Sequence, residues 1–288
     1  MAHDTEETPY AESSFNFSYI DETAFCSQYK NNGKFLVMSL NIQSLNSKFN
    51  ELRQLVSNML YHNCAPDVIC LQEIWQIPNS ALLSIPNYFP LECLMRHNQV
   101  QGGGVGIYFK ETVQYRILKE QSIMFDKVFE SIFAEVITEN KKKYLIGSKY
   151  RPGNHSSMPQ SEQFNQFIEL FANSLSDFTE VYERIYLFGD FNIDLLKYTS
   201  SNQVAEYIDL LFSFGFLQVI PKPTRVTDNS ATLIDHVLTN TYCKTYESMA
   251  LCSHISDHFP ILHFLAGPSA ATLPKFLEYR DFSEDPRL

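Results

Sequence analysis

One pattern recurs along the sequence: a short apolar run is ended by a polar or acidic residue. Short apolar runs bounded by turn residues are typical of buried β-strands. The residues that end or directly follow these runs are Asn41, Glu73, Tyr150, Asp190 with Asn192, Asp235 with His236, and Asp257 with His258. Ligands of α/β sheets bind beyond strand ends, so such residues can converge on one site. Each alone could equally end or cap a strand, but six coincidences in one chain favour a site.

The apolar runs also predict the order of the elements. Residues 35–40 read as a strand, residues 49–60 carry apolar side chains at helical spacing, and residues 68–71 read as a second strand, which together make a βαβ unit. Short strands separated by turns follow, as in antiparallel hairpins, over 88–95, 103–109, 113–118, 131–138 and 144–150. The remaining predicted elements are helices over 164–175 and 204–212 and strands over 184–188, 232–238 and 259–264.

The two ends of the chain differ in composition from its middle. Residues 1–33 contain six acids and one base, and we expect a flexible acidic leader there. Residues 265–288 are charged and punctuated by prolines, and we expect a polar tail that frays. The intervening residues 34–264 are predicted to form one domain, long enough to bury a substantial core.

Composition and charge limit the environment and the partners. No run approaches the ~18 apolar residues of a membrane span, and the N-terminus lacks the features of a secretory signal. We expect a soluble intracellular protein without membrane contacts, in the nucleus or the cytoplasm, with its six cysteines reduced. The net charge of −11 predicts that any contact with a nucleic acid is local and salt-sensitive.

A glycine-rich stretch, Gln101-Gly102-Gly103-Gly104-Val105-Gly106, runs into one of the predicted hairpin strands. It lacks the Lys-Ser/Thr of a phosphate-binding loop and leads into a strand rather than a helix. We therefore do not interpret it as a nucleotide site. The basic run at 141–143 is likewise interpreted as an exposed hairpin tip rather than a DNA clamp.

The polar strand ends lie within a set of short motifs that resembles the endonuclease/exonuclease/phosphatase superfamily. The motifs are, in order, Ser39-Leu40-Asn41, Leu71-Gln72-Glu73, Tyr150-Arg151-Pro152, Gly189-Asp190-Phe191-Asn192, Leu233-Ile234-Asp235-His236 and Ser256-Asp257-His258-Phe259-Pro260. Within the superfamily the chain is most similar to the apurinic-type endonuclease domain of LINE-type (non-LTR, jockey-like) retrotransposons, through Pro223-Thr224-Arg225 and Leu238-Thr239-Asn240. The resemblance covers about residues 34–264. It implies an α/β (α+β) four-layer sandwich of two packed mixed β-sheets flanked by helices, as in deoxyribonuclease I.

The resemblance further implies a metal-dependent endonuclease that nicks DNA to leave 3′-hydroxyl and 5′-phosphate ends. Mg²⁺, or Mn²⁺ in its place, would be held by Glu73, with Asn41 beside it and Asp257 as a second carboxylate. Magnesium commonly takes one or two carboxylates together with water and substrate phosphate. Asp190 resembles the water-activating carboxylate of the family, and Asn192 would orient it or the scissile phosphate.

The same resemblance assigns residues to the phosphate. His258 would contact it, with Asp235 fixing the imidazole tautomer, and Tyr150 would donate a hydrogen bond to a phosphoryl oxygen. Further substrate contacts are expected from Arg151, Thr224 and Ser256. For Arg151 an ion pair with a surface acid is the alternative. His236 is expected to point away from the site, because side chains alternate along a strand.

Several functions remain open within this resemblance. In a retroelement, the 3′-hydroxyl would prime reverse transcription, so a reverse transcriptase domain would belong to the same element; we expect a monomer that binds DNA. The alternatives are a repair endonuclease for abasic DNA, a phosphoesterase acting on small molecules or inositol lipids, and an inactive nucleic-acid-binding relic. The acidic net charge suits the phosphoesterase better. No catalytic position is visibly replaced, which favours an active enzyme.

Overall fold

The computed structural model describes residues 14–30, 33–77, 79, 82–96, 101–138, 141–153, 158–243 and 245–265, and these contain two large β-sheets. The first sheet contains, in spatial order, β1 (Ser14–Asp21), β15 (Thr245–Cys252), β16 (Ile261–Phe264), β2 (Leu36–Asn41), β3 (Val68–Gln72), β5 (Val105–Phe109) and β4 (Glu92–Leu94). The second contains β11 (Leu217–Gln218), β14 (Asp235–Thr239), β10 (Ile185–Asp190), β9 (Lys143–Tyr150), β8 (Phe129–Ile137) and β6 (Gln114–Ile117), with β7 (Ile123–Phe125) paired to β8. A separate hairpin is formed by β12 (Arg225–Thr227) and β13 (Ser230–Thr232).

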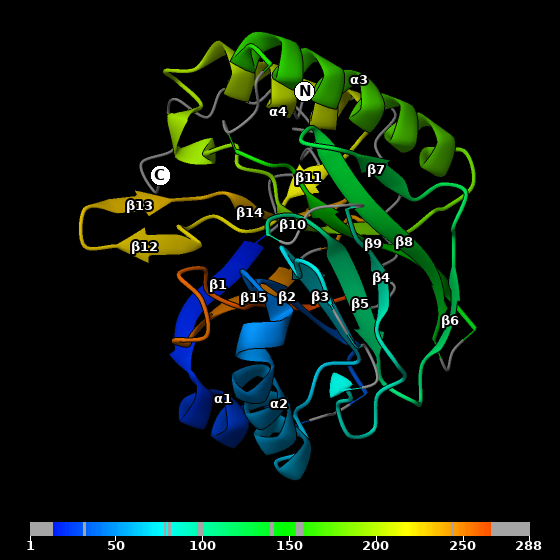
Figure 1. Cartoon of the computed structure of the whole chain (residues 1–288), viewed down its shortest axis with the longest axis vertical. Helices are drawn as coiled ribbons and strands as arrows, with labels where there is room; N and C mark the ends of the chain where they lie inside the picture. Colours follow the sequence, from blue (N-terminus) through cyan, green and yellow to red (C-terminus); the bar gives the residue numbers. More distant parts are fainter. Residues whose placement is uncertain are drawn as a thin grey trace, which may run out of the picture.

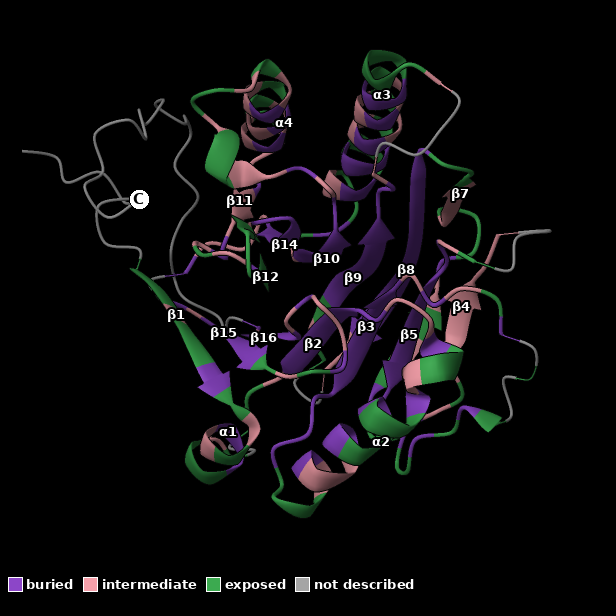
Figure 2. Cartoon of the chain, turned by 60° about the vertical axis from the view of Figure 1, so that its left-hand side comes forward, coloured by how far each residue is buried: buried purple, intermediate pink, exposed green. Residues whose placement is uncertain are grey.

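Helices cover the outer faces of both sheets (Figures 1 and 2). The helices α1 (Glu22–Gln28) and α2 (Leu45–Tyr61) lie on the first sheet, and α3 (Gln160–Thr179) and α4 (Asn202–Ser213) lie on the second. A short 3₁₀ helix spans Leu195–Lys197. Three apolar clusters separate these layers: one under α1 and α2, one between the sheets, and one under α3 and α4. The predicted four-layer sandwich is therefore confirmed.

The central strands are buried on both faces, which explains their uninterrupted apolar runs. Every residue of β2, β3 and β10 is buried. Within β2, Val37 faces the second sheet, whereas Met38 and Leu40 face α2. Alternate residues of one strand therefore belong to two different apolar clusters, as the pleat of a strand requires.

The pairing of the central strands brings the polar strand ends to one edge of the sandwich. The strands β2 and β3 run parallel, so that Asn41 lies opposite Gln72. The strands β9 and β10 are also parallel and place Tyr150 opposite Asp190. Because β14 runs antiparallel to β10, its first residue, Asp235, lies beside Asp190 at the same edge.

The prediction of a flexible leader over 1–33 is wrong for residues 14–28. Residues of β1 pair in parallel with β15 along the whole strand, from Ser14 opposite Thr245 to Asp21 opposite Cys252. Phe15 stacks on Tyr246 with ring centroids 5.2 Å apart, and α1 follows with Phe25 and Cys26 in the core. The predicted tail over 265–288 lies, except for Leu265, outside the described residues.

Two minor predictions agree with the structure. The glycine-rich stretch leads directly into β5, and Lys141 and Lys143 are exposed at the turn between β8 and β9. Among the described residues, no helix combines the length and apolar character needed to cross a membrane.

Candidate active site

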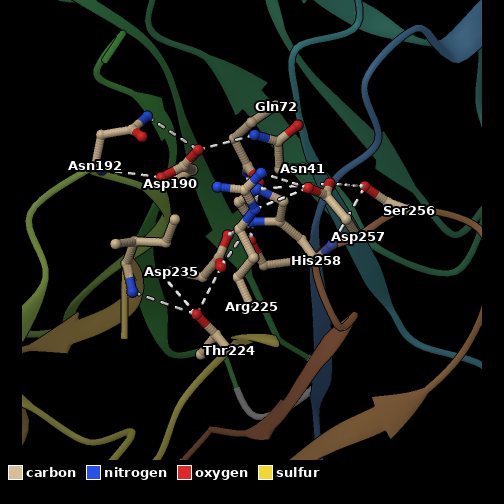
Figure 3. Close-up of polar contacts among 12 residues, drawn as sticks. Asn41, Gln72, Asp190, Asn192, Thr224, Arg225, Asp235, Ser256, Asp257 and His258 are labelled. Carbon is tan, nitrogen blue, oxygen red and sulfur yellow. Dashed lines mark hydrogen bonds and ion pairs between the residues drawn. The ribbon is translucent and has the colours of Figure 1, made fainter. Parts of the chain in front are cut away.

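Most of the residues predicted from the strand ends meet in one polar cluster, part of which is drawn in Figure 3. Asn41 comes from β2 and Asp190 from β10, while Asp235 and His258 face them from β14 and from the loop between β15 and β16. All four side chains are buried. Ligand atoms of Asp190, Asp235 and His258 lie within 4.8 Å of one another.

The Asn41 side chain connects two carboxylates. Its Nδ2 donates hydrogen bonds to Glu73 Oε1 and to Asp190 Oδ2, each at 2.8 Å. Glu73 is half-buried and follows β3, and its Oε2 accepts a bond of 3.4 Å from the indole nitrogen of Trp75. Both Glu73 and Trp75 adopt left-handed backbone conformations, with φ of 51° and 60°, which are uncommon for residues other than glycine. Such strained residues cluster at functional sites.

Asp190 is held from several directions at the end of β10. Its Oδ1 accepts the backbone N–H of Asn192 at 2.9 Å, and its Oδ2 accepts the Asn192 amide at 3.1 Å. The Asn192 amide also donates to the Arg151 carbonyl at 2.8 Å. The preceding Gly189 has a φ of 152°, and a Cβ there would lie 1.8 Å from the Lys149 carbonyl oxygen. Only glycine therefore lets β10 approach β9 closely enough at this point.

Burial controls the protonation of Asp190. Desolvation raises the pKa of this carboxyl to about 7, and the charge of Asp235 adds to the increase. The charge of His258 and the hydrogen bonds from Asn192 and Asn41 lower it in part. A carboxylate with a pKa near neutrality can both accept and release a proton at physiological pH.

His258 and Asp235 form a buried dyad. The imidazole Nδ1 lies 2.9 Å and 3.0 Å from the two Asp235 oxygens, and Thr224 Oγ1 donates to Asp235 Oδ2 at 2.6 Å. Burial on its own lowers the pKa of His258, but the charges of Asp235, Asp190 and Asp257 outweigh it and raise the pKa to about 9. The imidazole is therefore protonated at neutral pH, with Nδ1 committed to Asp235.

Asp257 is engaged by a residue that the sequence does not predict for the site. Arg225 donates from Nε and Nη2 to Asp257 Oδ2, at 2.8 Å and 2.6 Å. Burial acts to raise the pKa of Asp257, but the Arg225 hydrogen bond and the neighbouring charges lower it overall. Ser256 Oγ lies 3.4 Å from Asp257 Oδ1 and so belongs to the same cluster. Its position directly after Thr224, in the motif Pro223-Thr224-Arg225, is the feature of the sequence that could have indicated a role for Arg225 in the site.

The structure contradicts both readings of Arg151. Its side chain is only 4% exposed, so it reaches neither a DNA backbone nor a surface acid. Its guanidinium packs over Phe164 and Phe167 and contacts the Phe191 and Asn192 carbonyl oxygens at 3.4 Å and 3.3 Å. Burial lowers the pKa of Arg151 to about 10. Arg151 therefore supports the backbone of Phe191 and Asn192, which directly follow Asp190.

His236 and Tyr150 lie as the strand pattern predicts. His236 points away from the site, stacks on Phe191 and contacts the Tyr207 hydroxyl at 3.0 Å. Burial lowers the pKa of His236 to about 4, so it is neutral. Tyr150 ends β9 and is 7% exposed; burial, with Glu73 and Asp190, raises the pKa of its hydroxyl. The hydroxyl remains protonated and can donate a hydrogen bond.

The cluster contains two groups of residues that could hold a metal ion. Asp190, Asp235 and His258 are close enough to share one. However, a protonated imidazole cannot be a ligand, and Nδ1 of His258 is already bonded to Asp235. Glu73 offers a carboxylate that is not fully buried. Asn41 offers its carbonyl oxygen Oδ1, which accepts the Gln43 backbone N–H at 3.3 Å, while its Nδ2 faces Glu73. An all-oxygen set of this kind fits Mg²⁺ better than the histidine-containing group.

Comparisons with known proteins identify the family. Residues 38–258 match the model of the Endonuclease/Exonuclease/phosphatase family, and this range includes every candidate site residue from Asn41 to His258. A search of curated protein sequences found no significant match.

Solved structures share the fold at low sequence identity. A 3′-5′ exonuclease from Neisseria meningitidis superposes with a TM-score of 0.59 at 14% identity, covering 80% of this chain and 98% of that one. A 3′ phosphatase from Neisseria bound to a product DNA hairpin gives 0.58 at 16% identity, over 81% and 100% of the two chains. An AP endonuclease from Archaeoglobus fulgidus gives 0.55 at 13% identity, over 80% and 98%. The chain therefore belongs to the endonuclease/exonuclease/phosphatase family and has its hydrolase fold.

Proposed function

We propose that the protein is a Mg²⁺-dependent phosphodiesterase that nicks DNA and leaves 3′-hydroxyl and 5′-phosphate ends. One observation carries this proposal. The Asn41 amide links Asp190 to Glu73 on one side, and the protonated His258 lies close to Asp190 on the other. Phosphodiester hydrolysis needs a base for the attacking water and positive charge near the phosphoryl oxygens. The arrangement supplies both within one buried cluster.

Each side chain has a role that follows from its contacts. Asp190 accepts the proton of the water that attacks phosphorus, and Asn192 and Asn41 fix the orientation of its carboxylate. The P–O3′ bond breaks, and the departing 3′-oxygen takes a proton from solvent water and leaves as the 3′-hydroxyl. The proton on His258 Nδ1 is held by Asp235, which leaves Nε2 to donate to a phosphoryl oxygen. A metal ion held by Glu73 and Asn41 supplies counter-charge for the phosphate when bound.

The hydroxyl groups and Asp257 complete the proposed phosphate site. Tyr150 donates a hydrogen bond to a phosphoryl oxygen, and Thr224 acts through Asp235, to which it donates. Asp257, Ser256 and Arg225 would form the rim of this site. Because Arg225 already engages the Asp257 carboxylate, we assign Asp257 to supporting the metal site rather than to direct ligation. Glu73 and Asn41 are thus the primary ligands in this proposal.

The proposal includes a substrate and a biological role. The substrate is DNA, and the role is target-site nicking as in LINE-type retrotransposons. The motifs around Thr224 and Thr239 support the retroelement assignment. DNA is also a ligand of two structural neighbours, the Neisseria 3′ phosphatase with its product hairpin and a zebrafish protein, D. rerio TDP2, with a single-strand DNA product. In a retroelement, the 3′-hydroxyl would serve an accompanying reverse transcriptase.

Purified protein is expected to convert supercoiled plasmid to nicked circles with Mg²⁺ and to leave it intact with excess EDTA. DNA ligase should reseal the nicks, because it requires a 5′-phosphate beside a 3′-hydroxyl. Abasic duplex, intact duplex and inositol phosphates should be assayed in parallel. Nicking that survives EDTA would contradict the metal requirement. A strong preference for abasic duplex would assign the protein to DNA repair instead of target-site nicking, and a strong preference for inositol phosphate would assign it to small-molecule hydrolysis.

The rate of nicking is expected to show a bell-shaped pH dependence. Asp190 must be deprotonated to act as a base, so activity rises with pH through a limb centred no higher than about 7. His258 must stay protonated, so activity falls as the pH rises through about 9. Nicking rates measured from pH 5 to 10 at constant ionic strength test this. If the activity of Asp235→Asn falls at the same alkaline pH as that of the wild type, the Asp235–His258 dyad does not determine this part of the pH profile.

A further inference from the structure

A buried acid outside the predicted site connects the two sheets next to Glu73. Glu130 lies in β8, is fully buried, and stands opposite Tyr150 in the pairing of β8 with β9. Its Oε2 accepts the backbone N–H of Gly104 at 2.5 Å, and its Oε1 accepts a hydrogen bond of 2.5 Å from Arg96 Nε. Glu130 therefore anchors the glycine-rich stretch, which belongs to the first sheet, to a strand of the second.

The glycine-rich stretch in turn holds the residues that follow Glu73. The carbonyl of Gly104 accepts the N–H of Ile74 at 3.2 Å, and the carbonyl of Gly103 accepts the N–H of Trp75 at 2.9 Å. These bonds act on the backbone segment in which Glu73 and Trp75 have positive φ. A positive φ is strained at residues other than glycine and persists only where the surroundings enforce it.

The packing explains two of the glycines in this stretch. Gly103 and Gly104 have φ of 70° and 83°. A Cβ on Gly104 would lie 2.8 Å from Ile74 Cγ1, and a Cβ on Gly103 would overlap the Arg96 guanidinium. The backbone therefore comes into direct contact with the residue after Glu73 on one side and with the Arg96–Glu130 pair on the other.

We propose that Glu130 is a positioning residue for the metal carboxylate Glu73, acting through Gly104 and the backbone of Ile74 and Trp75. A buried ion pair adds little to stability on its own, so precise placement of a neighbouring loop is a better reason for its presence. The inference rests on the proposed function, because Glu73 is a metal ligand only there. Residues that hydrogen-bond directly to a metal ligand typically change metal affinity 10–100-fold when they are replaced, and Glu130 acts one step further away, through the backbone.

The chain contains its own probe for the test. Trp75 is the only tryptophan, and its indole nitrogen donates to Glu73 Oε2 at 3.4 Å, so its fluorescence should report cation binding at Glu73. Mg²⁺ is titrated into wild type, Glu130→Gln and Glu135→Gln, with calorimetry as a second readout. Glu135 is a matched control because it lies in the same strand, is also buried, and pairs with Arg116 and Lys143 at the opposite end.

Glu130→Gln is expected to raise the Mg²⁺ concentration for half-saturation about tenfold or more, and nicking should recover at high Mg²⁺. Glu135→Gln should titrate like the wild type. Half-saturation at the wild-type concentration in a folded Glu130→Gln protein would overturn the inference and leave the proposed nuclease intact. Absence of any Mg²⁺ response in the wild type, by fluorescence and calorimetry, would overturn both.

A second variant keeps the test valid if Glu130→Gln folds poorly. Gly104→Ala leaves Glu130 in place but pushes its new Cβ against Ile74. The same increase in the half-saturating Mg²⁺ concentration is expected, because the segment after Glu73 is displaced. A Gly104→Ala protein with the affinity of the wild type would contradict the proposed path.

Discussion

Replacing Asp190 with asparagine is expected to reduce DNA nicking about 10³-fold, within the range lost when a general base is removed. Asparagine matches the size of aspartate, and its carbonyl oxygen in the place of Oδ2 can still accept from the Asn41 and Asn192 side-chain amides. Its NH2 group cannot accept the backbone N–H of Asn192 that Oδ1 accepts in the wild type. Asparagine cannot accept a proton from water. Single-turnover nicking at saturating Mg²⁺ measures the loss, and Asp209→Asn on the exposed face of α4 is the control. A variant that nicks at the wild-type rate would show that another group is the base.

The same substitution is expected to stabilise the fold at alkaline pH. Burial raises the folded-state pKa of Asp190 from 3.8 to about 7, so its ionisation favours the unfolded chain. The folded protein binds more protons than the unfolded one between these two values, and its stability therefore falls as the pH rises through this interval. Thermal melts should coincide for wild type and Asp190→Asn below pH 4, and the variant should melt higher at pH 8. A lower melting temperature of the variant at pH 8 would contradict this account.

Lys149→Met is expected to increase the free energy of unfolding at pH 7 by about 1–3 kcal/mol, the usual cost of a buried polar group without a partner. Lys149 lies in β9 and is fully buried, and its Nζ has no hydrogen-bond partner among the described residues. It lies over the rings of Phe129, Phe133 and Phe171, at 4.9, 4.2 and 4.9 Å from their centroids. Contacts with aromatic rings do not satisfy the hydrogen-bonding capacity of the amine, so the lost hydration is not compensated. Methionine keeps the length and removes the polar end.

The pH dependence distinguishes this effect from a general gain in packing. Burial lowers the pKa of Lys149 well below 10.5, so the unfolded chain binds a proton that the folded chain lacks. The stability of the wild type therefore contains a contribution that rises with pH up to about 10, and the advantage of Lys149→Met should shrink over the same range. Urea unfolding from pH 6 to 10 measures both, with the exposed Lys119→Met as the control. A constant advantage would exclude deprotonation of Lys149 as the cause.

The fold and the centre of the site could be predicted because their signals are local in the sequence. Strands such as β2 and β10 are buried on both faces, so they are continuous apolar runs, and the residues that end them are polar because they face the site. The parallel and antiparallel pairing of such strands then brings Asn41, Asp190 and Asp235 to one edge without further information.

The sequence analysis misjudged or missed residues whose surroundings are supplied by distant parts of the chain. Phe15 and Phe17 already alternate with polar residues as in a strand, but the acidic neighbourhood hides this signal, and the partner strand lies more than 200 residues away. Arg151, Lys149 and Glu130 are charged, and charged residues are normally exposed. Their burial depends on carbonyl groups, aromatic rings and a backbone N–H that other elements supply.

The parallel pairing of β1 with β15 has a practical consequence for anyone expressing a shorter chain. A fragment trimmed to the family match, residues 38–258, would lack β1 at the edge of the first sheet and also β16, which pairs with both β15 and β2 in its interior. The open backbone of β15 and β2 would then be free to pair with other molecules, a common origin of aggregation. The segment that the family model matches is therefore shorter than the segment that the first sheet needs in order to be complete.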